Sequence, residues 1–239
     1  MAVIKKINLA VFDIDDTLYP FGALHVEAIN FVAEYIEKEF GIPKQGLIDE
    51  YNAELARQMK LYPQLVNCHS RTIRFQRIAE HDKRLPLGMA TQLSDMYWNT
   101  LLEKMTPFPG IVELFRSLKA SGIKIGICTD MTADWQIKKL VAIGLADYVD
   151  FVVSSEEAGV EKPSRQAFEL CLEKGGNCDP STAIMFGDNY KKDIVGALGV
   201  GMNAVWYNPN KNVLENKAPG VIELNSYVDI EKTLIIEKA

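Results

Sequence analysis

Cysteine is scarce in this chain of 239 residues, and its four copies form no C-x-x-C pair. Four widely spaced cysteines are too few to staple a chain of this length, so a disulfide scaffold is not expected. None lies in a sequence context typical of a nucleophile, and we expect reduced, mostly packed thiols. The four are Cys68, Cys128, Cys171 and Cys178.

Long hydrophobic runs are also missing. The apolar stretches fall well short of the ~20 residues that a membrane-spanning helix needs. Residues 1–13 show no apolar segment followed by a small-residue cleavage site of the kind that ends a signal peptide. We therefore expect a cytoplasmic protein without a membrane partner.

An excess of basic charge is the third absence. The 32 acidic residues outnumber the 26 basic ones, and the formal net charge is −6. This balance offers no broad electrostatic attraction for a nucleic acid polymer or an anionic membrane. A small molecule that carries phosphate would need a local positive site.

Strand and helix patterns alternate along most of the chain. The hydrophobic fraction of 48% and the charged fraction of 24% are typical of a globular protein. Short runs that are apolar at consecutive positions suit strands covered on both faces; they lie at 7–12, 124–128, 148–153, 183–186, 203–207 and 221–224. Helical patterns lie at 111–120, 132–143, 164–173, 193–198 and 229–237. The alternation predicts an α/β fold, with a three-layer, Rossmann-like parallel sheet as its core.

The alternation fails between the first two strands, where residues 21–105 show helical patterns only. These lie at 24–40, 44–61, 68–81 and 86–103. In the first, one face is expected to hold Leu24, Ala28, Phe31, Tyr35 and Ile36. We therefore expect an all-helical module of residues 21–105, inserted into a core of residues 1–20 and 106–239.

Three acidic side chains follow the first predicted strand, in Asp13-Ile14-Asp15-Asp16-Thr17. Carboxylates at the carboxyl end of a buried parallel strand lie where open α/β sheets bind ligands. An Asp-rich turn that caps the next element is the alternative. Neighbouring carboxylates repel one another unless a cation compensates, and Mg²⁺ prefers oxygen ligands from one or two carboxylates. A divalent ion is the simplest occupant of such a site.

Polar residues follow three later strands in the same way. Thr129 ends the second strand, Lys162 follows the third, and Gly187-Asp188 with Asp193 follows the fourth. Each has a plain structural alternative: a helix cap for the threonine and for Asp193, and a solvated surface for the lysine. Parallel strands would bring all four strand ends to one edge of the sheet.

In this order the motifs resemble those of the haloacid dehalogenase superfamily of phosphotransferases, over nearly the whole chain. Asp13-Ile14-Asp15-Asp16-Thr17-Leu18 is similar to the family's first motif, Thr129 to its second, Lys162 to its third, and Gly187-Asp188 with Asp193 to its fourth. The helical insertion resembles the family's helical cap of the first class. Together with residues 187–202, it resembles the nucleotidase and sugar-phosphate phosphatase branches.

The resemblance implies a role for each strand end. Asp13 would be the nucleophile that forms an aspartyl-phosphate, and Asp15 would protonate the leaving alcohol and then deprotonate the attacking water. Mg²⁺ would bind the Asp13 carboxylate, the backbone carbonyl of Asp15 and Asp188. Thr129 and Lys162 would hold the phosphoryl oxygens. Dehalogenases of this superfamily carry no acid at the position of Asp15, because a halide leaves without a proton.

Three further residues are implied beside these. Asp193 would orient Lys162 or a water molecule on the metal, with Asn189 supporting the same loop. Asp130 belongs to the phosphate-binding strand end, where members of the family often carry Asn. A carboxylate would repel phosphate there, so we expect its side chain to turn away and cap the helix at 132–143.

Substrate choice is expected to lie in the helical insertion. His69, Arg71 and Arg74 are its candidate specificity residues, and Arg71, Arg74 and Arg77 advance by three along one helix. A solvated basic face is the favoured interpretation of these arginines. An arginine that faced the core would instead favour a substrate with a nucleobase or a second anionic group.

The leading hypothesis is a Mg²⁺-dependent phosphatase of small phosphomonoesters, with nucleoside monophosphates or sugar phosphates favoured. A phosphomutase on the same scaffold is the alternative, and a non-catalytic regulatory protein is a third. The partner is then a small-molecule substrate rather than a polymer, and the protein is a monomer or a small homo-oligomer.

Overall fold

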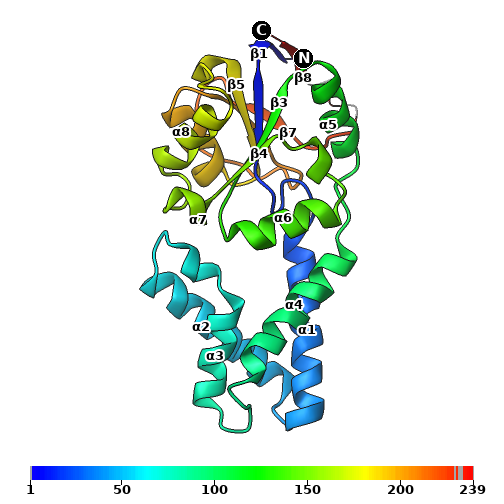
Figure 1. Cartoon of the computed structure of the whole chain (residues 1–239), viewed down its shortest axis with the longest axis vertical. Helices are drawn as coiled ribbons and strands as arrows, with labels where there is room; N and C mark the ends of the chain where they lie inside the picture. Colours follow the sequence, from blue (N-terminus) through cyan, green and yellow to red (C-terminus); the bar gives the residue numbers. More distant parts are fainter. Residues whose placement is uncertain (1, 229, 231–233, 239) are drawn as a thin grey trace. The chain divides into compact units, whose positions relative to one another are not determined.

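The structure, a computed structural model, describes residues 2–228, 230 and 234–238, the side chains of 2–6 and 234–238 excepted. The chain divides into two compact units, shown in Figure 1. Met1–Pro20 and Thr106–Ala239 form one, here called the α/β unit, and Phe21–Met105 form the other, the helical unit.

The α/β unit is built on a six-stranded sheet in which every neighbouring pair is parallel. The strand order is β4-β3-β2-β5-β6-β7. Their bounds are β2 Leu9–Phe12, β3 Lys124–Thr129, β4 Phe151–Ser154, β5 Ala183–Gly187, β6 Asn203–Tyr207 and β7 Ile222–Leu224. This confirms the predicted Rossmann-like sheet. Strand β2, which leads into the first acidic motif, lies between β3 and β5. The end of β2 is therefore flanked by the ends of two other strands.

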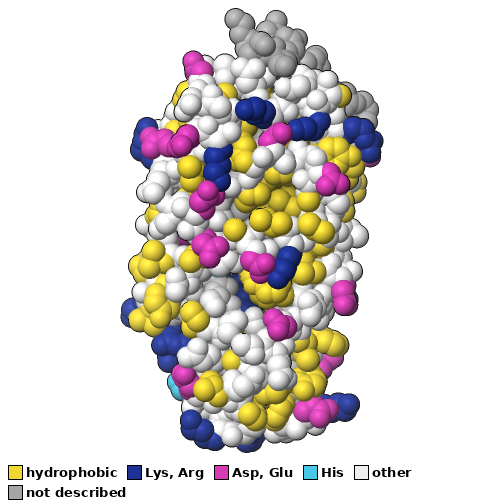
Figure 2. Space-filling model, in the orientation of Figure 1, with side chains coloured by type: hydrophobic (Ala, Val, Ile, Leu, Met, Phe, Trp, Pro, Cys, Tyr) yellow, Lys and Arg dark blue, Asp and Glu magenta, His cyan; other side chains and the backbone are white. Residues whose placement is uncertain are grey.

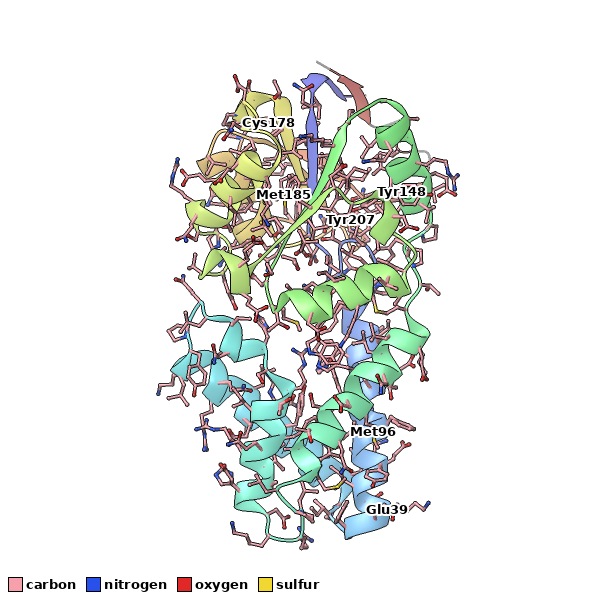
Figure 3. The ribbon with its side chains drawn as sticks, viewed as in Figure 1. Glu39, Met96, Tyr148, Cys178, Met185 and Tyr207 are labelled. Atoms are coloured by element: carbon pink, nitrogen blue, oxygen red, sulfur yellow. The ribbon has the colours of Figure 1, made fainter. Side chains whose placement is uncertain are left out.

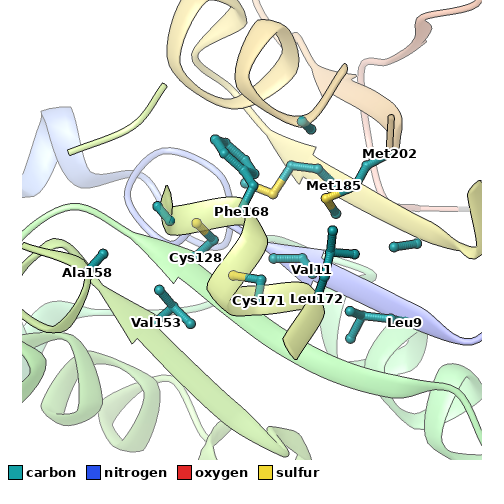
Figure 4. Packing of buried hydrophobic residues seen from close by; sticks show 13 residues of the cluster. Leu9, Val11, Cys128, Val153, Ala158, Phe168, Cys171, Leu172, Met185 and Met202 are labelled. Carbon is teal, nitrogen blue, oxygen red and sulfur yellow. The ribbon is translucent and has the colours of Figure 1, made fainter. Parts of the chain in front are cut away.

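Helices cover both faces of this sheet, which gives three layers. On one face α8 (Arg165–Lys174) and α9 (Val195–Gly199) pack against the strands, and Phe168 and Met185 lie in the shared core (Figure 4). On the other face Phe12 of β2 packs against Phe115 of α5 (Ile111–Ala120), with ring centroids 4.7 Å apart. Burial on both faces explains why the strands are apolar at consecutive positions.

The helical unit consists of four α-helices and one 3₁₀ turn among its residues. They are α1 Phe21–Phe40, α2 Lys44–Leu61, η1 Val66–His69, α3 Arg71–His81 and α4 Met89–Lys104. On α1 the buried stripe is centred near Ile29 and Val32. Phe31 falls at its edge and is half exposed, so the expectation that it shares the buried face is wrong. The predicted helix at 68–81 is broken at Ser70, whose hydroxyl accepts a hydrogen bond from Ile73 N–H at the start of α3.

Further elements connect these helices and strands in the α/β unit. They are α6 Ala133–Ala142, η2 Ala146–Tyr148, α7 Ser155–Ala158, η3 Pro180–Thr182 and the π-helical turn η4 Tyr190–Ile194. Tyr148, expected at the start of a strand, therefore ends a 3₁₀ turn instead. The predicted helix at 193–198 begins with the π turn, so Asp193 lies inside a helical segment rather than at its first position.

The chain ends also differ from the expectation. The predicted strand 7–12 is divided at Asn8, and Ile7 closes a separate strand β1 (Ala2–Ile7) that pairs in parallel with β8 (Leu234–Lys238). The predicted helix 229–237 is therefore wrong over 234–237; its residues 229 and 231–233 lie outside the described residues. Leu234-Ile235-Ile236 is a short apolar run, and such β-branched runs favour strands.

The charged side chains on the surface and the state of the cysteines agree with the expectations from the composition. Basic and acidic side chains are interspersed on the face drawn in Figure 2. All four cysteines are free thiols, three of them buried and one, Cys178, partly exposed. Cys178 is labelled in Figure 3. Among the helices that the structure describes, none combines the length and the apolar character required to cross a membrane.

Candidate active site

The carboxyl ends of β2, β3 and β5 lie side by side because their residues pair in register. Phe12 pairs with Ile127 on one side and with Phe186 on the other. Directly after β2, the Asp13 N–H donates to the Phe186 carbonyl at 2.9 Å, which extends the pairing by one residue. Asp13 is thus held at the sheet edge by backbone geometry.

Lys162 joins all three of these strand ends. Its Nζ lies 2.6 Å from Oδ1 of Asp13 and 2.6 Å from Oδ1 of Asp193, and it donates to the Cys128 carbonyl at 3.0 Å. The lysine is buried, and burial disfavours its charge. The carboxylates of Asp13 and Asp193 outweigh that effect and raise the pKa of Lys162.

Asp193 is fixed from behind by the loop after β5. Its Oδ2 accepts the Asn189 N–H at 2.9 Å, while the Asn189 side chain accepts the Lys192 N–H at 3.1 Å. A Cβ at position 187 would overlap the Asp193 carboxyl group, so the residue there must be glycine. Gly187 and Asp193 therefore act together in shaping this strand end.

Thr17 links the first and the fourth motif, a role that sequence reasoning missed. Its hydroxyl lies 3.4 Å from Oδ2 of Asp13 and 3.3 Å from Oδ1 of Asp188, and it accepts the Asp188 N–H at 3.0 Å. The side chain is fully buried. The signal for this role in the sequence was the position of the threonine as the last residue of the D-x-D-x-T motif.

Three carboxylates converge at this edge and can hold a cation. Oxygens of Asp13, Asp188 and Asp193 lie within 4.8 Å of one another. Burial, followed by repulsion from Asp193 and Asp16, raises the pKa of Asp188 to about 7. Burial also raises the pKa of Asp13, against the attraction of Lys162. A hard divalent cation with oxygen ligands would relieve this repulsion, so the donor set fits such an ion.

Asp15 lies apart from that group and has its own partners. Both oxygens of its carboxylate lie 2.7 Å from Nζ of Lys139 on α6, and the Tyr19 hydroxyl donates to Oδ1 at 2.5 Å. The Lys139 side chain is fully buried. Sequence reasoning missed Lys139, because in the helical pattern 132–143 it looks like an ordinary charged surface residue.

Polar groups at the end of β3 form hydrogen bonds with other side chains of the protein. Gln136 of α6 donates to the Thr129 hydroxyl, and also to the Asp130 carbonyl at 2.8 Å. The expected capping of the helix by Asp130 is wrong. Its carboxylate accepts the Lys162 N–H at 3.0 Å and lies 2.7 Å from Nζ of Lys192. The turn that carries Lys162 thus offers Asp130 a backbone N–H, and Lys192 of η4 offers it a cation. Glu156 instead accepts the Ala133 N–H at the start of α6.

The candidate specificity residues lie in the helical unit. Arg71 and Arg74 are buried there, so the favoured interpretation of a solvated basic face is wrong for both. Arg77 is partly exposed and forms an ion pair with Glu54 at 3.7 Å. The His69 carbonyl accepts a hydrogen bond from Arg71 at 2.7 Å.

Known proteins are similar to this chain in sequence and in fold. The family model of haloacid dehalogenase-like hydrolases matches residues 7–201. A ribulose-1,5-bisphosphate 5-phosphatase from Halopiger xanaduensis is 34% identical over 84% of this chain and 84% of its own length. The pyrimidine 5'-nucleotidase YjjG from Escherichia coli is 30% identical over 82% of this chain and 84% of its own. The crystal structure of a HAD phosphatase from Thermococcus onnurineus has a TM-score of 0.75 at 26% identity, over 95% of this chain and 97% of that one.

Proposed function

This chain belongs to the haloacid dehalogenase-like hydrolase family, and from that membership we propose that it is a Mg²⁺-dependent phosphatase of small phosphomonoesters. Similar proteins carry the names of phosphatases that act on a sugar bisphosphate and of a nucleotidase. Their shared chemistry is hydrolysis of a phosphoric monoester. Nucleoside monophosphates and sugar phosphates are the substrate classes we favour.

The observation that carries the proposal is the position of Lys162 between Asp13 and Asp193. A carboxylate nucleophile and an anionic phosphoryl group repel each other, and a fixed ammonium beside the nucleophile reduces that repulsion. Lys162 would hold the phosphoryl oxygens together with the strand end at Thr129. Asp193 would keep the ammonium in place.

Two displacements account for the hydrolysis. In the first, Asp13 attacks phosphorus and the bond from phosphorus to the ester oxygen breaks, which leaves an aspartyl-phosphate. Asp15 gives its proton to the departing alcohol oxygen. In the second, water attacks phosphorus, Asp15 takes a proton from that water, and Asp13 is released with inorganic phosphate. We propose that Asp15 exchanges its contacts with Lys139 and Tyr19 for the reacting oxygen.

Asp13, Asp188 and the backbone carbonyl of Asp15 would hold the metal ion. When bound, Mg²⁺ supplies positive charge that lets the anionic nucleophile and the anionic phosphate approach. The convergence of Asp13, Asp188 and Asp193 and the raised pKa values of the first two support this ligand set. Thr17 would orient two of the ligands through its hydroxyl.

The two units would have different roles in the reaction. We propose that the α/β unit, residues 1–20 and 106–239, carries the hydrolytic chemistry, and that the helical unit, residues 21–105, is the cap that selects substrates. The substrate is a small molecule rather than a nucleic acid or a membrane. We further propose a cytoplasmic protein that is a monomer or a small homo-oligomer, which light scattering of the purified protein tests.

A screen of the purified protein tests the function. Phosphate release is measured over nucleoside monophosphates, sugar phosphates and bisphosphates, with and without Mg²⁺, and Asp13→Asn serves as the blank. We expect release that needs Mg²⁺, and a loss of at least about a thousandfold in kcat for the variant, because removing a nucleophile typically costs this much or more. Unchanged release by Asp13→Asn would refute the assignment of the nucleophile. No release from any ester would refute the phosphatase.

A further inference from the structure

Asp130 follows Thr129 at the end of β3, next to the groups proposed to hold the phosphoryl oxygens. One oxygen of its carboxylate accepts the Lys162 N–H at 3.0 Å, which fixes the turn that carries the lysine. The Asp130 side chain is only 12% exposed, so water and salt screen its negative charge weakly. A weakly screened carboxylate would repel a phosphoryl group bound beside it. The position of Asp130 therefore requires a neighbouring cation.

Lys192 of η4 supplies this cation. Its Nζ lies 2.7 Å from Oδ2 of Asp130 and 2.9 Å from Oε2 of Glu161. Within the described part of the chain, it is the one cation at ion-pair distance from the Asp130 carboxylate. Burial disfavours the charge of Lys192, but Asp130 and Glu161 outweigh this effect and raise its pKa. Lys192 is therefore a permanent cation at neutral pH.

The π turn η4 thereby holds Lys162 at two points. Oδ1 of Asp193 lies 2.6 Å from Nζ of Lys162, at the end of its side chain. Lys192, the residue before Asp193, holds Asp130, and Asp130 accepts the backbone N–H of Lys162. Two consecutive residues of one turn thus fix the side chain of Lys162 directly and its backbone through Asp130.

We propose that Lys192 is a positioning residue of the active site that acts through Asp130. The ion pair holds the backbone of Lys162 in place, and it neutralises a carboxylate that would otherwise repel phosphate. The inference rests on the proposed function and deepens it. An asparagine at position 130 could accept the same N–H through its amide oxygen but would form no ion pair. The need for Lys192 should therefore depend on the negative charge at position 130.

A double-mutant cycle on phosphate binding tests this dependence without any turnover. Isothermal titration calorimetry measures the Kd of inorganic phosphate, with Mg²⁺ present, for the parent chain, Lys192→Met, Asp130→Asn and the double variant. In the parent background we expect Lys192→Met to raise the Kd by about tenfold, because an uncompensated carboxylate then lies beside the phosphate. In the Asp130→Asn background the same substitution should change the Kd by less than about twofold, because no carboxylate remains there.

Three further variants serve as controls. Lys191→Met is the matched one, because Lys191 is the exposed neighbour of Lys192 in the same turn, and it should leave the Kd unchanged. Lys192→Gln keeps a hydrogen-bond donor without the charge and should raise the Kd as Lys192→Met does; it replaces Lys192→Met should that variant fail to fold. Lys162→Met should abolish binding, which shows that the phosphate measured is the one at the sheet edge.

Urea denaturation of the same proteins separates this role from a purely structural one. An ion pair that only joins η4 to the end of β3 would lower the free energy of unfolding when either partner is replaced, and would leave the phosphate affinity of the folded protein unchanged. That outcome overturns the proposal. An equal rise of the Kd in both backgrounds also overturns it, because Lys192 would then act independently of the charge of Asp130.

The outcomes also distinguish this role from the phosphatase activity. In an active enzyme kcat/KM should fall by about tenfold for Lys192→Met, and by less than about twofold when Asp130→Asn is already present. Phosphate binding that shows the expected dependence, without phosphate release from any ester, retains the role of Lys192 and refutes the phosphatase. Phosphate release by a chain whose phosphate affinity is unchanged in Lys192→Met retains the phosphatase and refutes the role of Lys192.

Discussion

At the scale of single residues, the balance of charge around Lys162 explains why a divalent cation suits this site. The ammonium contacts two carboxylates, those of Asp13 and Asp193, and Asp188 adds a third within the same group. One ammonium thus faces three carboxylates, and a divalent cation would offset the negative charge that Lys162 leaves uncompensated. The pKa of Asp188 is raised to about 7 without a cation, and a bound cation would lower it.

The ammonium of Lys139 contacts both carboxylate oxygens of Asp15, and a substitution of Lys139 removes it. For Lys139→Met we expect kcat to fall by about tenfold or more, since positioned general acid–base groups contribute a hundredfold to ten-thousandfold. KM should change little, because Asp15 acts in proton transfer rather than in phosphate binding. Steady-state kinetics on the best substrate measures both constants.

Lys138→Met is the matched control for this variant. Lys138 is adjacent, half exposed and paired with Asp134 on the surface of α6. Its substitution should leave kcat and KM unchanged. A Lys139→Met enzyme that is folded by circular dichroism and retains full kcat would show that the ion pair has no part in positioning Asp15.

At the scale of elements, a π-helical turn decides where Asp193 points. The turn η4 follows β5 and contains Asp193, whose two oxygens then reach Lys162 and the Asn189 N–H. π turns are rare and often lie at functional sites. A π turn does not follow the 3.6-residue period by which an α-helix is recognised in a sequence. The helix predicted at 193–198 therefore starts later than the helical segment in the structure.

Gly187→Ala tests how tightly this element is packed. The added methyl group would overlap the Asp193 carboxyl group, so either the π turn or the end of β5 must shift. We expect a loss of about 1–3 kcal/mol in the free energy of unfolding, typical of overpacking, and a loss of phosphatase activity through displaced Asp193 and Lys162. Urea denaturation and phosphate release measure the two effects.

Gly199→Ala serves as the control, because nothing lies within 4 Å of a Cβ at that position. It should retain both stability and activity. A Gly187→Ala protein as stable and active as the parent chain would show that the loop after β5 tolerates displacement.

The same elements show what the sequence could predict. Asp13 and Asp188 are visible as acidic residues at the ends of apolar runs, and parallel pairing brings these strand ends together. Lys162 follows β4 only after helix α7, and its position beside Asp13 is seen in the structure. Lys139 and Thr17 were not found, because a buried polar residue within a helical or turn pattern looks like a solvated one. Only the three-dimensional structure shows that their polar atoms face the site.

At the scale of the whole molecule, both units bury charged side chains of both signs. The α/β unit gathers carboxylates around Lys162 at a sheet edge, whereas the helical unit buries Arg71, Arg74 and Glu54 in its interior. A net charge of −6 conceals these buried groups, because it sums both units. Composition alone therefore excluded a polybasic surface but could not locate the buried charges.

Burial of His25, followed by repulsion from Arg71 and Arg74, lowers its pKa and makes the stability of the protein depend on pH. Its pKa is about 4 in the folded protein, against an ordinary value of 6.5, so the folded state holds the ring neutral. Between these values the unfolded chain binds more protons than the folded one. The stabilisation due to neutral His25 is therefore complete above pH 6.5 and is lost as the pH falls towards 4. Because His25 is only partly buried, we expect a loss of about 1–2 kcal/mol rather than the full value of the shift.

Urea denaturation from pH 7 to pH 4 measures this loss, with His25→Gln and the control His81→Gln compared at each pH. His81 is half exposed and lies 3.2 Å from Glu50 at the end of α3. The parent chain and His81→Gln should lose more stability over this range than His25→Gln, because only His25→Gln lacks the ring beside the two arginines. Carboxylates titrate in all three proteins, and their contribution cancels in the comparison. Equal slopes for the three proteins would mean that neither burial nor the arginines lower the pKa of His25.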